Sequence, residues 1–422
     1  MPTNRARCTP RRLLALTVPA VLLILSACTS SDESAAATST PSTSDATTAA
    51  PSVPATPSPS PSASGPANVY AGTGIGDLAP AARTARSMVY VPNSQANTVQ
   101  LIDPATFKVV RTFRVGREPQ HVVPAWDLSR LWVNSDKGNS LVPINPRTGR
   151  HGRPVAVADP YNLYFTPDGK HALVMAERLH RIDVRDPHTM RLQRSLPVKC
   201  SGINHADYTA DLRHLVVSCE FSGELLVIDR GVTKVEKVIN LNAWKTPGGD
   251  TPMEARMSSG PKSQLRPGAS AMPQDVRLTP DGRWVLAADM LRNGVWVIDA
   301  RSFTIHRFIH TGKGAHGIYP SRDAARLFVS NRDEGTVSVL DAATLKPVAR
   351  WRIPGGGSPD MGGVTADGTQ LWLSGRYDSR VYVIDTATGR LLKSIRVRAG
   401  PHGMCVWPQP GSYSLGHTGN MR

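Results

Sequence analysis

The sequence lacks the short motifs by which most enzyme active sites are identified. It contains no nucleophile elbow, no phosphate-binding loop, no CxxCH haem-attachment motif and no HExxH zinc motif. Lysines and arginines do not cluster into a run that indicates a specific nucleic-acid site, although the net charge of +16 favours anionic partners such as envelope polymers. These absences remove the direct evidence for hydrolase or kinase chemistry. They leave open a site assembled from distant segments.

Aromatic rings and positive charges are absent from residues 28–68, which consist mainly of Ser, Thr, Ala and Pro. Such a segment cannot bury enough apolar surface to offset the entropy that ordering would cost. We therefore predict a disordered tether over these residues.

The apolar stretch at residues 13–25 is too short to span a membrane, because a helix of this length reaches about 20 Å against a hydrocarbon core of about 30 Å. Arginines precede it, as is typical of a secretory signal, which we assign to residues 1–27. The following "LSAC" resembles the lipobox of bacterial lipoproteins. The resemblance implies that Cys28 is acylated and anchors an exported protein to the outer face of the cell membrane. Two alternatives are release of an unlipidated protein and twin-arginine export through Arg11 and Arg12.

Cysteine is scarce, with five residues in the chain. After export, three of them remain in an oxidising compartment. Cys200 and Cys219 flank a predicted hairpin with its turn near Asp211, so we expect a disulfide between them. Cys405 is then an odd thiol, which we expect to be a buried small hydrophobe.

One pattern recurs through the rest of the chain. An alternating apolar stretch that ends in Asp or Asn is repeated seven times, at Asp103, Asn145, Asp186, Asp229, Asp299, Asp341 and Asp385. All spacings but one lie between 41 and 44 residues. A period in the low forties with four short strands per unit is typical of β-propeller blades, and Asp-Gly pairs such as Asp281-Gly282 fit the tight turns between strands.

The strand count predicts how the ring closes. The first unit begins with a second strand at "SMVYVPN", whereas the chain ends with a spare first strand, "PHGMCVW". We predict an all-β, seven-bladed propeller over residues 69–408 whose last blade takes strands from both ends, followed by a polar tail at 409–422.

The repeats resemble the YVTN-type (YncE-like) propeller family across residues 87–407. The motif appears as "VYVPN", "LFVSN" and "LWVNS". Relatives of that family include the haem-binding propeller of cytochrome-type nitrite reductases and the propeller of nitrous oxide reductase. The resemblance implies an architecture more than an activity, because this fold hosts both enzymes and binding platforms.

The first strands of the blades begin with polar residues, which a propeller places at one mouth of its central channel. They are His121, Asn162, His205, Asp275, His316, Asp360 and His402. Imidazoles with carboxylates suit Cu, Zn or Fe, so one interpretation is a metal site. A small-molecule site without metal and a solvated structural ring are the alternatives. His316 and His402 lie one position earlier than His121 and His205, so the four could form two pairs.

The one long spacing, 70 residues, contains an insert at 242–272 between two blades. We interpret it as a lid or partner-binding loop with Trp244, Met253 and Met257 as anchors, or as a tolerated disordered loop.

We therefore expect a monomeric, lipid-anchored binding protein of the cell envelope that presents its channel face to a ligand or an envelope partner. The alternatives are a metal-dependent oxidoreductase that uses the ring residues and, less favoured, a lactonase-like hydrolase.

Overall fold

The computed structural model describes residues 68–245, 264–417 and 419–422. These residues belong to one compact unit, and the predicted signal and most of the tether lie outside them. The helices of the described residues are two short turns, α1 (Pro80–Arg83) and η1 (Leu241–Ala243), neither of which has the length or apolar character to cross a membrane. All other regular structure is β-strand.

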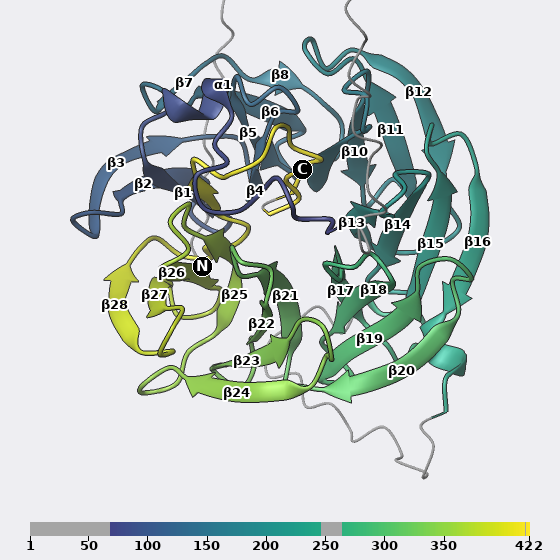
Figure 1. Cartoon of the computed structure of the whole chain (residues 1–422). Coiled ribbons are helices and arrows are strands. Elements are labelled where there is room, and N and C mark those ends of the chain that lie inside the picture. The colour runs from purple at the N-terminus through teal and green to yellow at the C-terminus, as the bar shows by residue number, and fades with distance from the viewer. Residues whose placement is uncertain (1–67, 246–263, 418) are drawn as a thin grey trace, which may run out of the picture. The chain divides into compact units, whose positions relative to one another are not determined.

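Seven sheets are arranged around a central axis (Figure 1), which confirms the predicted propeller. The inner strands are β4 (Pro119–Pro124), β9 (Asn162–Phe165), β13 (Ile203–Tyr208), β17 (Pro273–Leu278), β21 (Ala315–Pro320), β25 (Pro359–Val364) and β29 (Cys405–Trp407). The second strands are β5 (Leu131–Ser135), β10 (Ala172–Ala176), β14 (His214–Cys219), β18 (Trp284–Asp289), β22 (Arg326–Asn331), β26 (Gln370–Gly375) and β1 (Met88–Asn93).

The outer half of each sheet follows the same order. The third strands are β6 (Ser140–Asn145), β11 (Arg181–Arg185), β15 (Glu224–Asp229), β19 (Gly294–Asp299), β23 (Thr336–Asp341), β27 (Arg380–Asp385) and β2 (Thr98–Asp103). The outermost strands are β12 (Leu192–Pro197), β16 (Val235–Asn240), β20 (Ile305–His310), β24 (Pro347–Arg352), β28 (Leu391–Arg396) and β3 (Lys108–Arg114). In the remaining blade this strand is split into β7 (Arg150–His151) and β8 (Val155–Ala156), with Pro154, which has no N–H to donate, between them.

The ring closes as the strand count predicts. Strand β29 pairs antiparallel with β1, and Trp407 lies opposite Met88. The last blade therefore takes its inner strand from the end of the chain and its other three strands from the start of the ring. Pairing these strands removes the two free sheet edges that an open ring would leave.

The repeated acidic residues shape the turns. In the turn between β17 and β18, Asp281 accepts hydrogen bonds from Thr279 Oγ1 and the Arg283 N–H, while Gly282 has a φ of +67°, where a glycine is favoured. The repeat residue Asp299 accepts from the N–H groups of Arg301 and Ser302. Both mechanisms recur around the ring, which explains why the pattern is visible in the sequence.

The tail after β29 runs back into the ring. Most of residues 409–422 are buried, and short bridges join Gly411 to Leu78, Gly416 to Tyr164 and Ser414 to Met421. Asn420 donates to the Ala206 carbonyl (2.8 Å), and the Arg422 guanidinium pairs with Asp207 (2.8 Å). These contacts lie on the later parts of inner strands β9 and β13, so the tail occupies the end of the channel toward which the inner strands run (Figure 1).

Leu415 tests this docking, because it is fully buried against the blades through Tyr164 and its neighbours. We predict that Leu415→Ala lowers the free energy of unfolding by about 2–5 kcal/mol, as expected for a buried leucine. Urea denaturation measures the change. Leu192→Ala, at a leucine that is 46% exposed on β12, is the matched control and should change little. Equal effects of the two substitutions would show that the tail does not dock.

Candidate functional site

A bulge at the same place in several inner strands directs their side chains into the channel. The pairing register of β13, β17, β21 and β25 with the second strand shifts at the same place in each blade. Serines of the second strands hydrogen-bond the N–H groups that these bulges free: Ser218 with His205, Ser330 with Gly317, and Ser374 with Met361. Bulges re-aim side chains, and here they turn the predicted polar residues toward the axis.

His316 and His402 form one pair, held by a shared carboxylate. Asp360 lies 2.7 Å from Nδ1 of His402 and 3.2 Å from Nδ1 of His316, and it is also ion-paired to Arg332. Burial alone would raise the pKa of Asp360, but Arg332 and His316 together hold it below its usual value. Asp360 is therefore ionised; it hydrogen-bonds His402 and lies close beside His316.

His121 and His205 form the second pair, with ring centres 5.4 Å apart. His417 from the tail lies beside both, with its ring centre 4.8 Å from each. Burial lowers the pKa of His121 to about 3, and it also lowers the pKa of His205 and His417 well below the usual range, so these rings are neutral imidazoles. Gly403 makes room for this arrangement, because a Cβ there would overlap the His121 ring.

Two further predicted residues support the second pair. Asn162 is buried with its amide nitrogen 3.2 Å from Nδ1 of His205. Asp275 is buried, and its Oδ2 accepts from Arg277 Nη2 (3.3 Å) and the Ile318 N–H (3.0 Å). Burial raises the pKa of Asp275 to about 6, with Arg277 opposing the shift.

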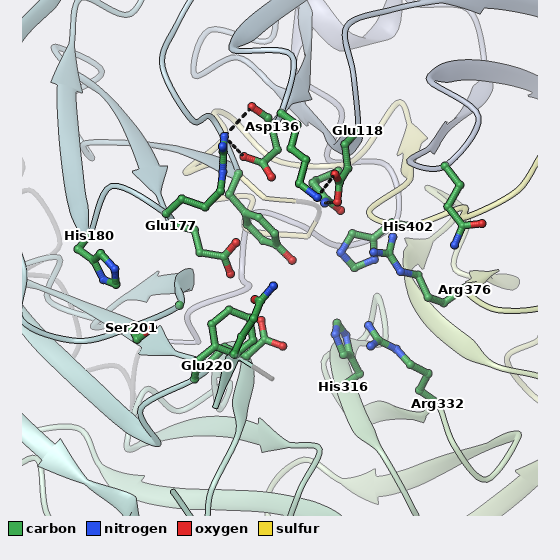
Figure 2. Close-up of a pocket in the computed structure, with 18 of the residues that line it drawn as sticks. Glu118, Asp136, Glu177, His180, Ser201, Glu220, His316, Arg332, Arg376 and His402 are labelled. Atoms are coloured by element: carbon green, nitrogen blue, oxygen red, sulfur yellow. Dashed lines mark hydrogen bonds and ion pairs between the residues drawn. The ribbon is translucent and has the colours of Figure 1, made fainter. Parts of the chain in front are cut away.

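A cavity of about 570 Å³ opens at the end of the channel where the inner strands begin. His316 and His402 line its floor, and charged side chains form its wall (Figure 2). The remaining predicted ring residues lie below or beside it and do not line it.

A second ring is built from the residue that directly follows the second strand of each blade, and its charged members line the cavity. In ring order these residues are Ser94, Asp136, Glu177, Glu220, Met290, Arg332 and Arg376. Three consecutive blades thus contribute acids, and two consecutive blades on the other side contribute arginines. Figure 2 shows Glu177 and Glu220 facing Arg332 and Arg376 across the cavity.

The acidic arc holds more carboxyl groups than its neighbouring cations pair with in the described residues. Arg178 pairs with Asp136 (3.2 Å) and Asp159 (2.8 Å). Burial, followed by a hydrogen bond with Asp159, raises the pKa of Asp136 to about 7. Burial and then the charge of Glu220 raise the pKa of Glu177 well above its usual value, and burial also raises the pKa of Glu220. Within the described residues, neither Glu177 nor Glu220 has an ion-pair partner.

Of the two arginines in the basic arc, one is ion-paired to a carboxylate of the described residues and the other is not. Arg332 is bound to Asp360, and its Nη1 contacts Tyr377 Oη (3.3 Å). Arg376 is half-buried, lines the cavity and donates to the Ser94 hydroxyl (3.2 Å). No carboxylate of the described residues forms a salt bridge with Arg376.

The remaining predicted sites are two cysteine sites, the insert and the lipidation site. Cys200 and Cys219 form a disulfide with a Cα–Cα distance of 5.9 Å, and Cys405 is a free, buried thiol. Of the insert 242–272, residues 246–263 fall outside the described residues, including Met253 and Met257. Trp244 packs beside Trp296, and Gln264 lines the cavity. Cys28 also lies outside the described residues.

Known structures share this fold at low sequence identity. The chain resembles a functionally unknown protein from Desulfotomaculum acetoxidans DSM 771, with 15% identity and a TM-score of 0.56 over 75% of this chain and 98% of that chain. It also resembles Kuenenia stuttgartiensis hydrazine synthase, with 16% identity and a TM-score of 0.53 over 75% and 94% of the two chains. For dihydro-heme d1 dehydrogenase NirN in complex with DHE, the identity is 14% and the TM-score 0.54, over 78% and 76%. At these identities the likeness shows the fold alone.

The sequence itself identifies the family. No curated protein matches it. The profile of the YNCE-like beta-propeller family matches residues 65–189 and 258–410, in agreement with the YVTN-type repeats. Because these segments make up more than half of the chain, the protein belongs to the YNCE-like beta-propeller family.

Proposed function

We propose that the protein is a binding protein whose channel mouth holds a small ligand that carries both an amine and an acid group. The observation that carries this proposal is the division of the wall into an acidic and a basic arc around one cavity. A ligand with opposite charges at its two ends complements this division. A ligand of one charge would leave one arc unsatisfied.

The acidic arc suits an ammonium group. Glu177 Oε1 is buried and has no hydrogen-bond partner among the described residues, while Glu220 accepts from Asn204 (2.7 Å). The Tyr161 ring also lines the cavity and can contribute a cation–π contact. An ammonium ion at this position would supply the counter-charge that two buried carboxyl groups lack.

The basic arc suits a carboxylate or another small anion. Arg376 presents its guanidinium to the cavity, and a guanidinium binds a carboxylate through two parallel hydrogen bonds. Nε2 of His402 can add a further contact, because Asp360 hydrogen-bonds Nδ1 of that ring, and the His316 ring also lines the cavity.

Binding is favoured over catalysis by the state of Asp360, the carboxylate that lies behind His316 and His402. Asp360 is ion-paired to Arg332 and has a lowered pKa, so it is a weak proton acceptor. This argues against Asp360 as the base of an oxidoreductase or a lactonase-like hydrolase, in which either Asp275 or Asp360 is expected to act as ligand or proton acceptor.

We further propose that the binding domain acts outside the cell, held at the membrane by a lipid on Cys28. The support is the order of segments in the sequence: a charged and apolar leader, "LSAC" and a polar linker before the propeller. A tether of this composition would let the channel face meet ligands at a distance from the membrane.

The binding proposal is tested with linear ω-amino acids of increasing length, each beside the alkylamine and the alkanoate of the same length. We expect isothermal titration calorimetry to show binding for the amino acid whose length matches the cavity. Loss of either charged group should weaken binding by about 10–100-fold, because a hydrogen bond to a charged group contributes about 1.5–3 kcal/mol. Equal affinity for an amino acid and its alkanoate would contradict the role of the acidic arc.

Substitutions should separate the two arcs. Glu220→Gln is predicted to weaken binding of the amine group, and Arg376→Gln to weaken binding of the acid group, each by about 10-fold or more. Glu236→Gln and Arg396→Gln, at exposed positions on the outer strands, are the matched controls and should bind like the unmodified protein. The double variant tests independence, since the loss from each arc should add.

The raised pKa values predict a pH dependence. Below its pKa of about 7, Asp136 is neutral and adds nothing to the attraction for an amine; above that pKa it is charged. Because Glu177 and Glu220 shift in the same direction, affinity for the amine should rise with pH between about 6 and about 8. Calorimetry across this range measures the effect, and Asp136→Asn should flatten it. Affinity that falls over this range would contradict the proposed contact.

The anchor has its own test. In cells of a lipoprotein-producing bacterium, the full chain should fractionate with membranes and incorporate labelled fatty acid. The Cys28→Ser variant should lose both properties, because no other residue can take the lipobox lipid. Cys405→Ser is the control and should remain membrane-bound. Release of the unmodified protein into the soluble fraction would refute the anchor without affecting the ligand-binding proposal.

A further inference from the structure

We infer that the channel interior, below the ligand cavity, binds one divalent transition-metal ion through His121, His205, His417 and Asp275, with zinc the best fit. The set differs from the ring expected from the sequence. It includes a histidine of the tail. It omits Asp360, which is ion-paired to Arg332, and His316, whose Nδ1 lies beside Asp360.

The spacing of the three rings fits a shared ion. Their centres lie 5.4, 4.8 and 4.8 Å apart, so each ring neighbours the other two. Two imidazoles that bind one tetrahedral zinc through nitrogens at about 2.0–2.1 Å place their ring centres about 5 Å apart. The rings are also turned edge to face, with interplanar angles of 82°, 83° and 69°, which is compatible with nitrogens converging from different directions.

The atoms that would bind the ion are buried and unpartnered within the described residues. They are both ring nitrogens of His121 and His417, Nε2 of His205 and Oδ1 of Asp275. One ligand atom from each of His205, Asp275 and His417 lies within 4.8 Å of the others. Each of the four side chains is at most 1% exposed. Buried polar atoms of native proteins normally have partners, so three that converge, with the unpartnered His121 ring beside them, indicate a missing ligand.

The surrounding residues can orient the ligands. Asp275 uses Oδ2 for Arg277 and the Ile318 N–H, which directs Oδ1 elsewhere. The Asn162 amide lies 3.2 Å from Nδ1 of His205. Its oxygen accepts the Leu163 N–H (2.9 Å), so the amide nitrogen faces the ring. Binding an ion through Nε2 requires the amide to turn over, at the expense of that bond, so that its oxygen accepts the Nδ1 proton as is usual for metal-bound histidines.

His402 provides a route between the cavity and the interior. Its ring lines the cavity, its centre lies 4.9 Å from that of His121, and its buried Nε2 has no partner among the described residues. Asp360 fixes its Nδ1 and so orients Nε2. An ion entering from the mouth would meet His402 before reaching the four ligands. Once bound, it would join the tail to three blades.

The test uses the full chain, purified without a metal-affinity tag and stripped with a chelator. Zinc is added in competition with a chromophoric chelator, elemental analysis gives the stoichiometry, and cobalt(II) serves as a spectroscopic probe of geometry. We expect one zinc per chain and visible cobalt bands typical of four-coordination. His417→Ala should lower the zinc affinity on the order of 100-fold or more, since even outer-shell changes cost 10–100-fold. His310→Ala, at an exposed histidine on β20, is the matched control and should bind like the unmodified protein.

The variants separate a lost ligand from a lost fold. Circular dichroism and thermal melting establish that His417→Ala is folded, and Asp275→Asn, a near-isosteric change, provides a second measurement from another blade. Retention of full zinc affinity by both folded variants would overturn the inference. Failure of the stripped, folded protein to take up any metal would overturn it as well and would assign the interior to buried water. Glu220→Gln should leave the zinc stoichiometry unchanged, so this outcome is independent of the proposed ligand site.

Discussion

The pairing of β29 with β1 is the interaction on which the rest of the structure depends. It closes the ring through three residue pairs, Met88–Trp407, Val89–Val406 and Tyr90–Cys405, and it leaves the final residues of the chain beside the channel. Because of that position, the tail can turn back into the ring and bury Leu415 and Met421. The closure therefore does two things at once: it completes the seventh blade, and it fills one end of the channel while the other end stays open as a cavity.

The open end of the channel gathers acidic side chains whose burial does not stabilise the fold. Asp136, Glu177 and Glu220 lie on neighbouring blades and are buried, so each raises the free-energy cost of ionising the others. Neutral residues would avoid this cost, as Ser94 and Met290 do at the equivalent position of two other blades. Perturbed acids that converge on a cavity are typical of functional sites. Here arginines lie on the side of the cavity opposite the acids. This arrangement favours a ligand with a positive group at one end and a negative group at the other.

The sequence predicts the fold far better than it predicts the site. Blade spacing, Asp-Gly turns and the incomplete first unit each reflect local backbone chemistry that repeats, so seven blades and their closure could be predicted. The ring of polar residues on the inner strands could also be predicted, because its members lie near the start of the first strand of each blade. The second ring, which includes Asp136, Glu177 and Arg376, could not be predicted, although each of its residues directly follows a second strand. Its members differ in type from blade to blade, and so they leave no repeat. His417 was missed because the tail has no periodicity and takes its position from contacts with distant strands.

We propose that a ligand with an amine and an acid group spans the cavity between the two arcs. A crystal structure of the protein with the best-binding ω-amino acid tests this directly. We expect electron density in the cavity with the ammonium group beside Glu177 and Glu220 and the carboxylate on Arg376. Density in the reverse orientation, or an empty cavity in crystals grown at a saturating concentration of the amino acid, would contradict it.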